Sequence, residues 1–125
     1  MKLLIAGSRS IKEYDIARHV PEGCELIITG GASGIDTLAE EYADKNRLSK
    51  LILRPDYKRY GRGAPLKRNE LMVELCDTAL IIWDGHSRGT KYTADQAAAK
   101  GKRVMLVTVE DSSEAARGCN NNPLA

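Results

Sequence analysis

The fold of this chain is decided by the stretch Thr29-Gly30-Gly31-Ala32-Ser33-Gly34-Ile35-Asp36. The apolar run at residues 26–28 precedes it and predicts a buried strand. Apolar residues then recur at the period of an amphipathic helix, namely Ile35, Leu38, Ala39, Tyr42 and Ala43. A strand, a glycine turn and a helix in this order direct free backbone N–H groups toward an anion. The stretch is therefore either a phosphate-binding loop or only a tight turn between a strand and a helix.

The rest of the chain alternates strands with helices. Apolar segments predict strands over residues 2–6, 24–29, 49–54, 78–83 and 103–109. Helical patterns occur over residues 10–20, 33–47, 66–76 and 91–100. Together they predict a Rossmann-like α/β fold, a doubly wound parallel sheet of about five strands with helices on both faces.

Local signals refine this prediction. Ser10 with Glu13, and Ser33 with Asp36, fit capping boxes at the starts of two helices. Polar and glycine-rich residues 56–65 predict an exposed loop. The last predicted helix turns a small-residue face toward the sheet, made of Ala94, Ala97 and Ala98. We expect one domain at residues 1–109, followed by a polar, mobile tail at residues 110–125.

Composition excludes several classes of protein. The 125 residues are 42% hydrophobic, and the net charge of +2 is too small for a general nucleic-acid binder. The apolar runs are far shorter than the roughly 20 residues of a membrane span, so we expect a cytoplasmic protein without a signal peptide. Three scattered cysteines fit a reducing compartment. No metal-ligand spacing occurs, and neither a metal nor another cofactor is expected.

Charge is concentrated in one segment. Residues 54–68 hold six basic side chains against the single acid Asp56. Tyr57 and Tyr60 lie among them and either stack on a base or are simply exposed. The segment fits a small phosphate ligand as well as a nucleic acid.

Ligands of doubly wound folds bind at the carboxyl ends of the strands. Three loops with glycine fall at such ends, and Arg68-Asn69 lies near the start of a helix beside them. The predicted nucleotide-binding residues are Gly7, Ser8, Arg9, Gly30, Gly31, Ala32, Ser33, Gly34, Asp36, Arg68, Asn69, Asp84, Gly85, Ser87, Gly89 and Thr90.

Individual roles stay open at this level. Arg9 is either a phosphate ligand or a solvated side chain. Asp36 either caps its helix or holds a ribose, and Asp84 holds a ribose, acts as an acid or base, or caps its turn. No catalytic constellation such as Ser-His-Asp or a carboxylate dyad is present.

Four of these motifs together resemble the SLOG superfamily, which joins the Rossmann-like domain of DprA/Smf with the "lonely guy" (LOG) proteins. They are Gly7-Ser8-Arg9, the stretch from Thr29 to Asp36, Arg68-Asn69, and Asp84-Gly85-His86-Ser87-Arg88-Gly89-Thr90. The likeness covers roughly residues 1–109 and is strongest to small single-domain members of unknown function. It implies a Rossmann-like fold, a nucleotide or nucleotide-derived ligand and a homo-oligomer.

LOG proteins are phosphoribohydrolases, which cleave the N-glycosidic bond of a nucleoside monophosphate. Arg68 matches their arginine, and Gly89-Thr90 match their glycine-threonine pair. Tyr92 and Thr93 stand where their catalytic glutamate belongs, and the nearest acid is Asp95. Catalytic residues therefore stay unknown, with Asp84, Asp36 or Asp95 as replacements.

The leading hypothesis is the binding or sensing of a nucleotide or nucleotide-derived ligand through the glycine-rich loops. The first alternative is hydrolysis of a nucleotide's N-glycosidic bond. The second is single-stranded nucleic-acid binding through residues 54–68, which is possible but not favoured. No membrane partner is expected.

Overall fold

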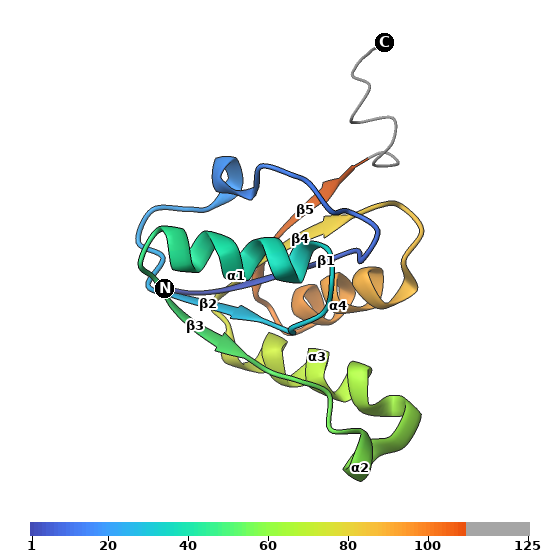
Figure 1. The fold of residues 1–125 in the computed structure, drawn as a ribbon. Helices are drawn as coiled ribbons and strands as arrows, with labels where there is room; N and C mark the ends of the chain where they lie inside the picture. Colours follow the sequence, from blue (N-terminus) through green and yellow to red (C-terminus); the bar gives the residue numbers. More distant parts are fainter. Residues whose placement is uncertain (110–125) are drawn as a thin grey trace.

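The computed structural model describes residues 1–109 (Figure 1). Its strands are β1 (Lys2–Gly7), β2 (Leu26–Thr29), β3 (Ser49–Ile52), β4 (Thr78–Trp83) and β5 (Arg103–Thr108). Its helices are η1 (Ile16–His19), α1 (Ile35–Lys45), α2 (Tyr57–Tyr60), η2 (Gly61–Gly63), α3 (Ala64–Leu75) and α4 (Arg88–Ala99). The tail expected at residues 110–125 lies outside the described residues.

The five strands form one parallel sheet in the order β3-β2-β1-β4-β5. Parallel strands need crossover connections, and here α1, α3 and α4 lie in those connections. The chain runs outward from β1 to β3 and then returns to β4 on the other side of β1. The predicted Rossmann-like α/β fold is confirmed. Its topological switch point lies between β1 and β4, which is where such folds form a crevice for ligands.

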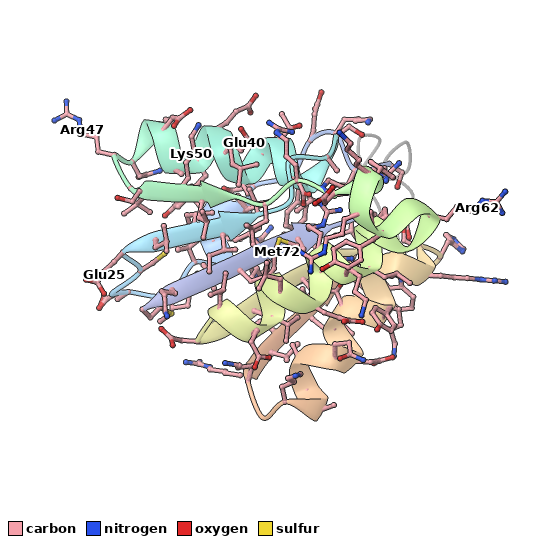
Figure 2. The ribbon with its side chains drawn as sticks, turned by 90° about the horizontal axis from the view of Figure 1, so that it is seen from below. Glu25, Glu40, Arg47, Lys50, Arg62 and Met72 are labelled. Atoms are coloured by element: carbon pink, nitrogen blue, oxygen red, sulfur yellow. The ribbon has the colours of Figure 1, made fainter. Side chains whose placement is uncertain are left out.

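Helices cover both faces of the sheet, α1 on one side and α3 with α4 on the other (Figure 1). Alternate residues of β1 divide between these faces, because successive side chains of a strand point in opposite directions. Leu3 and Ile5 pack in the cluster that includes α1, whereas Leu4 and Ala6 pack in the cluster that includes α3 and α4. Figure 2 shows Met72 of α3 between its helix and the sheet.

The predicted helix over residues 10–20 is wrong. Only Ile16–His19 is helical there, and it forms a single 3₁₀ turn. The Ser10 hydroxyl donates to the Asp84 carboxylate at 2.8 Å instead of capping a local helix. A contact 74 residues away along the chain thus replaces the predicted capping box.

The second predicted capping box is also wrong. Gly34 is the N-cap of α1, no side chain caps the helix, and Ser33 is exposed. Gly34 has a φ of +76°, and a Cβ there would lie 2.5 Å from the carbonyl oxygen of Ser8. A glycine is required because the β2–α1 loop passes directly against the loop that follows β1.

Two smaller expectations need correction. The segment predicted as an irregular loop contains the short helices α2 and η2, although its side chains are mostly exposed, as expected. On α4, Ala94 and Ala97 are buried against the sheet, but Ala98 faces solvent. No helix among residues 1–109 is long and apolar enough to cross a membrane.

Candidate functional site

A cavity of about 460 Å³ opens at the carboxyl ends of the central strands. The first turns of α1, α3 and α4 surround it, together with the loops that follow β1 and β4. Ten of the sixteen predicted residues line it: Gly7, Arg9, Ala32, Asp36, Arg68, Asn69, Asp84, Ser87, Gly89 and Thr90. Segments far apart in the sequence thus line one cavity.

The other six predicted residues do not line the cavity: Ser8, Gly30, Gly31, Ser33, Gly34 and Gly85. Ser8 holds neighbouring loops together. The Ser8 hydroxyl accepts the Asp84 N–H at 2.9 Å, and Ile35 donates its N–H to the Ser8 carbonyl at 3.4 Å. These bonds support a structural role for Ser8 in the wall of the cavity, whereas Ser33 and Gly85 are exposed.

Seven lining residues were missed: Ala6, Ser10, Pro65, Leu66, Met72, Arg88 and Thr93. Arg88 lies inside the Asp84–Thr90 motif, and it could have been predicted from its positive charge, which suits a phosphate ligand. Met72 follows Arg68 by four residues on α3, and that spacing places both on one side of the helix. Nothing in the local sequence separates the apolar lining residues from ordinary core residues.

Arg68 is the most constrained side chain of the site, with 9% of its surface exposed. Its Nη1 donates to the carbonyl oxygens of Gly30 at 2.5 Å and Leu53 at 3.1 Å. Its Nε donates to Asn69 Oδ1 at 2.7 Å. Among residues 1–109, no hydrogen bond involves Nη2, so that nitrogen still has two N–H groups to offer a ligand.

The glycine loop is occupied from within the protein. Arg68 binds the Gly30 carbonyl, and Arg54 Nη1 binds the Gly31 carbonyl at 3.2 Å. A Cβ on Gly30 would lie 2.5 Å from Arg68 Nη1, so glycine is needed for the guanidinium to approach. The two glycines therefore receive arginine side chains, and the loop faces the cavity only through Ala32.

Asp36 is the second buried charge of the site. The carboxylate, 5% exposed, accepts the Ala32 N–H at 3.2 Å. Burial raises the pKa of Asp36 above its ordinary value, and the Ala32 N–H and the charge of Arg68 oppose that rise. Burial likewise lowers the pKa of Arg68, and the negative charge of Asp36 opposes that change. Each group thus offsets part of the desolvation of the other.

Asp84 is saturated with hydrogen bonds. Its Oδ1 accepts the N–H groups of His86 and Ser87, each at 2.8 Å, and its Oδ2 accepts the Ser10 hydroxyl. Partial burial alone would raise its pKa, but these donors outweigh burial and lower the pKa to about 2. Of the three roles considered for Asp84, the geometry matches the turn cap. It also ties the loop after β1 to the start of α4.

The remaining substitutes for a LOG-type glutamate are poorly placed. Asp95 does not line the cavity; it is exposed and pairs with Lys91 at 2.7 Å, one turn away on α4. The Tyr92 hydroxyl donates to Glu70 at 2.8 Å. Asp36 is therefore the only one of the three named acids that both lines the cavity and retains capacity to accept hydrogen bonds.

The charge of the cavity favours an anion. Arg9, Arg68 and Arg88 line it against the carboxylates of Asp36 and Asp84. The first turn of α4 adds N–H groups that lack intrahelical partners, and no atom of residues 1–109 lies within 4 Å of a Cβ built on Gly89. Backbone N–H groups beside arginine side chains are a typical phosphate-binding arrangement.

Comparison with known families gives a clear assignment. The family model described as DNA recombination-mediator protein A matches residues 48–123, more than half of the chain. The chain belongs to this family. As a member of the DNA recombination-mediator protein A family it falls within the SLOG superfamily, so the predicted superfamily is confirmed. No curated protein and no solved structure matches the chain.

The family match covers only part of the cavity. It includes α3 and α4 with Arg68, Asn69 and the loop at Asp84. It begins after the glycine loop, so Asp36 and Arg9 lie outside the matched part of this DNA recombination-mediator protein A family member.

Proposed function

We propose that this chain binds a nucleotide or a nucleotide-derived molecule in the cavity at the ends of β1, β2 and β4. The observation that carries the proposal is the convergence of three arginines on one cavity beside the first turn of α4. The volume of about 460 Å³ lies within the range of small-molecule sites, roughly 300–1,000 Å³. The superfamily assignment supports the same class of ligand.

The phosphate would lie between Arg9, Arg88 and the first N–H groups of α4, with Arg68 Nη2 as a further donor. Arg9 and Arg88 are exposed, so their side chains can adapt to a ligand without disturbing the core. Arg68 is held rigid by its three hydrogen bonds, so its unused N–H groups are preorganised for binding.

Isothermal titration calorimetry with nucleoside monophosphates tests this proposal. Arg88→Ala should weaken binding about tenfold, because a hydrogen bond to a charged group contributes about 1.5 kcal/mol or more. Arg103→Ala is the matched control, since Arg103 is exposed at the amino end of β5, away from the cavity. Failure of every nucleotide to bind, or equal losses in both variants, would contradict the proposal.

The same mixtures, separated by chromatography, address catalysis. We expect the nucleotides to be recovered intact, because a LOG-type glutamate is replaced by Tyr92 and the carboxylate of Asp84 is already saturated. Release of free base would favour the N-glycosidase alternative and would direct attention to Asp36.

Single-stranded nucleic acid is a second candidate, supported by the DNA named in the family description and by the surface around α2. Lys58, Arg59 and Arg62 are exposed there, and Figure 2 shows the Arg62 side chain extending away from the body of the protein. Tyr57 and Tyr60 are 57% and 42% exposed, which makes them available for stacking on bases.

Fluorescence polarisation of labelled oligonucleotides separates the two candidates. Nucleic-acid binding predicts an affinity that falls steeply with salt and weakens in Arg62→Ala, with Arg103→Ala again as control. A mononucleotide in the cavity predicts a shallow salt dependence and no effect of Arg62→Ala.

A further inference from the structure

The cavity holds one carboxylate whose capacity to accept hydrogen bonds is largely unused. Asp36 accepts a single hydrogen bond of good geometry, from the Ala32 N–H to Oδ2. The Thr29 hydroxyl and the Gly30 N–H lie close enough to favour the ionised form, but within residues 1–109 neither completes a hydrogen bond to the carboxylate. An ionised carboxylate has about four acceptor positions, so most of them remain free.

Asp84, the other carboxylate of the cavity, differs in this respect. Two N–H groups and the Ser10 hydroxyl already occupy its oxygens at 2.8 Å, and the Ser87 hydroxyl donates to Oδ2 at 3.5 Å, so all four acceptor positions are in use. A ligand hydroxyl would have to displace one of these donors to reach it. Of the two candidates for holding a ribose, only Asp36 can do so without breaking existing hydrogen bonds.

Arg68 restricts what the ligand can bring to Asp36. A Cβ built on Gly30 would lie 2.5 Å from Arg68 Nη1 and 2.9 Å from Asp36 Oδ2. Since both atoms are this close to the same position, the guanidinium and the carboxylate are neighbours. A cationic ligand group at Asp36 would be repelled by the guanidinium. Neutral donors avoid that repulsion, and the two adjacent hydroxyls of a ribose are a neutral pair suited to one carboxylate.

We infer that Asp36 accepts hydrogen bonds from the ribose hydroxyls of the bound nucleotide, so that the site selects ribonucleotides over 2′-deoxyribonucleotides. This inference rests on the proposed function, because it assumes that a nucleotide occupies the cavity. It makes Asp36 a specificity-determining residue and assigns Asp84 to positioning the surrounding loops.

Calorimetry with AMP, GMP, CMP and UMP, each against its 2′-deoxy counterpart, tests the inference. For each base that binds, we expect the 2′-deoxy form to bind about tenfold or more weakly, because it lacks a hydrogen bond to a charged group. Asp36→Asn should weaken the ribonucleotide more than the 2′-deoxyribonucleotide, which brings only its 3′-hydroxyl to the carboxylate, so the ratio of the two affinities should fall. Asp95→Asn, the same substitution on the exposed pair with Lys91, should leave the ratio unchanged.

Equal affinities of the ribo and deoxy forms for the wild-type protein would overturn the inference and leave the proposed function intact. An unchanged ratio in Asp36→Asn would also overturn it. Failure of both forms to bind would overturn the inference together with the proposed function. Should Asp36→Asn not fold, 3′-deoxynucleotides on the wild-type protein supply the second measurement, and tight binding of both deoxy forms would overturn the inference.

Discussion

Replacing Gly30 with alanine tests the packing at the centre of the site. A Cβ at this position would lie 2.5 Å from Nη1 and 2.8 Å from Cζ of Arg68, and 2.9 Å from Oδ2 of Asp36. Gly30 is not among the glycines with positive φ, so alanine introduces a steric conflict without backbone strain. The guanidinium must move, and its Nη1 bonds to Gly30 and Leu53 lengthen or break.

The expected loss follows from those two bonds. Each hydrogen bond from a charged group contributes about 1.5–3 kcal/mol, and water recovers part of this when the guanidinium shifts. A glycine-to-alanine change also stabilises by about 0.4–1 kcal/mol through the unfolded chain. We therefore expect Gly30→Ala to lower the free energy of unfolding by about 2–4 kcal/mol, a large share of the 5–15 kcal/mol typical of a domain.

Urea unfolding followed by circular dichroism measures this change, and Gly63→Ala is its matched control. Gly63 has a φ of −79°, and within the described part of the chain no atom lies within 4 Å of a Cβ built there. Its alanine variant should be as stable as the wild type or slightly more so. If Gly30→Ala matched Gly63→Ala within about 0.5 kcal/mol, the proposed packing of Arg68 against Gly30 would be refuted.

Three further predictions concern the carboxylates. The folded-state pKa of Asp84 is about 2 against an ordinary 3.8, so its stabilising effect is present above pH 4 and is lost as the pH falls toward 2. The stability difference between the wild type and Asp84→Asn, followed by urea unfolding from pH 7 to pH 2, should therefore shrink over that range; a constant difference would contradict it. For Asp36 the pH dependence of stability is reversed. Because its pKa is raised, the folded state holds the proton more tightly than the unfolded state, and stability falls as the pH rises from 3.8 through the folded-state pKa. The stability of Asp36→Asn relative to the wild type should rise over the same interval in the same titration, and a fall would oppose the reasoning. Asp95→Asn should change the free energy of unfolding by less than about 0.5 kcal/mol, because an exposed i,i+4 pair contributes little, and a loss above about 1 kcal/mol would show otherwise.

The alternation of strands and helices could be predicted because burial imposes it on the sequence. β4 is apolar from Ala79 to Trp83 and lies inside the sheet between β1 and β5, and its predicted bounds match the structure residue for residue. β3 is an edge strand with mostly exposed side chains, and its predicted carboxyl end was two residues too long. Lys50 Nζ of this strand lies 4.0 Å from Glu40 Oε1 of α1, and Figure 2 shows both side chains on the same side of the protein.

Predictions from local patterns were wrong where residues distant in the sequence bind the hydroxyl or carbonyl groups that the pattern assigned to local partners. Ser10 satisfies every local requirement of a capping residue, yet its hydroxyl binds Asp84. The glycine loop has the sequence of a phosphate cradle, yet two of its carbonyls bind arginines that follow much later in the chain. The region of the site was predictable because the strand ends determine it, whereas the partners of its side chains depend on tertiary contacts.

The position of Arg68 links two parts of the surface. Its side chain lines the cavity at the carboxyl ends of the central strands and also a second cavity of about 550 Å³ beside α2, where Tyr60 and Lys67 contribute. Three hydrogen bonds hold the guanidinium in place, so both cavities share one fixed positive charge. Any change that an occupant of one cavity makes in the affinity of the other must be mutual and equal by thermodynamic reciprocity, so one titration in the presence of the other ligand measures both effects.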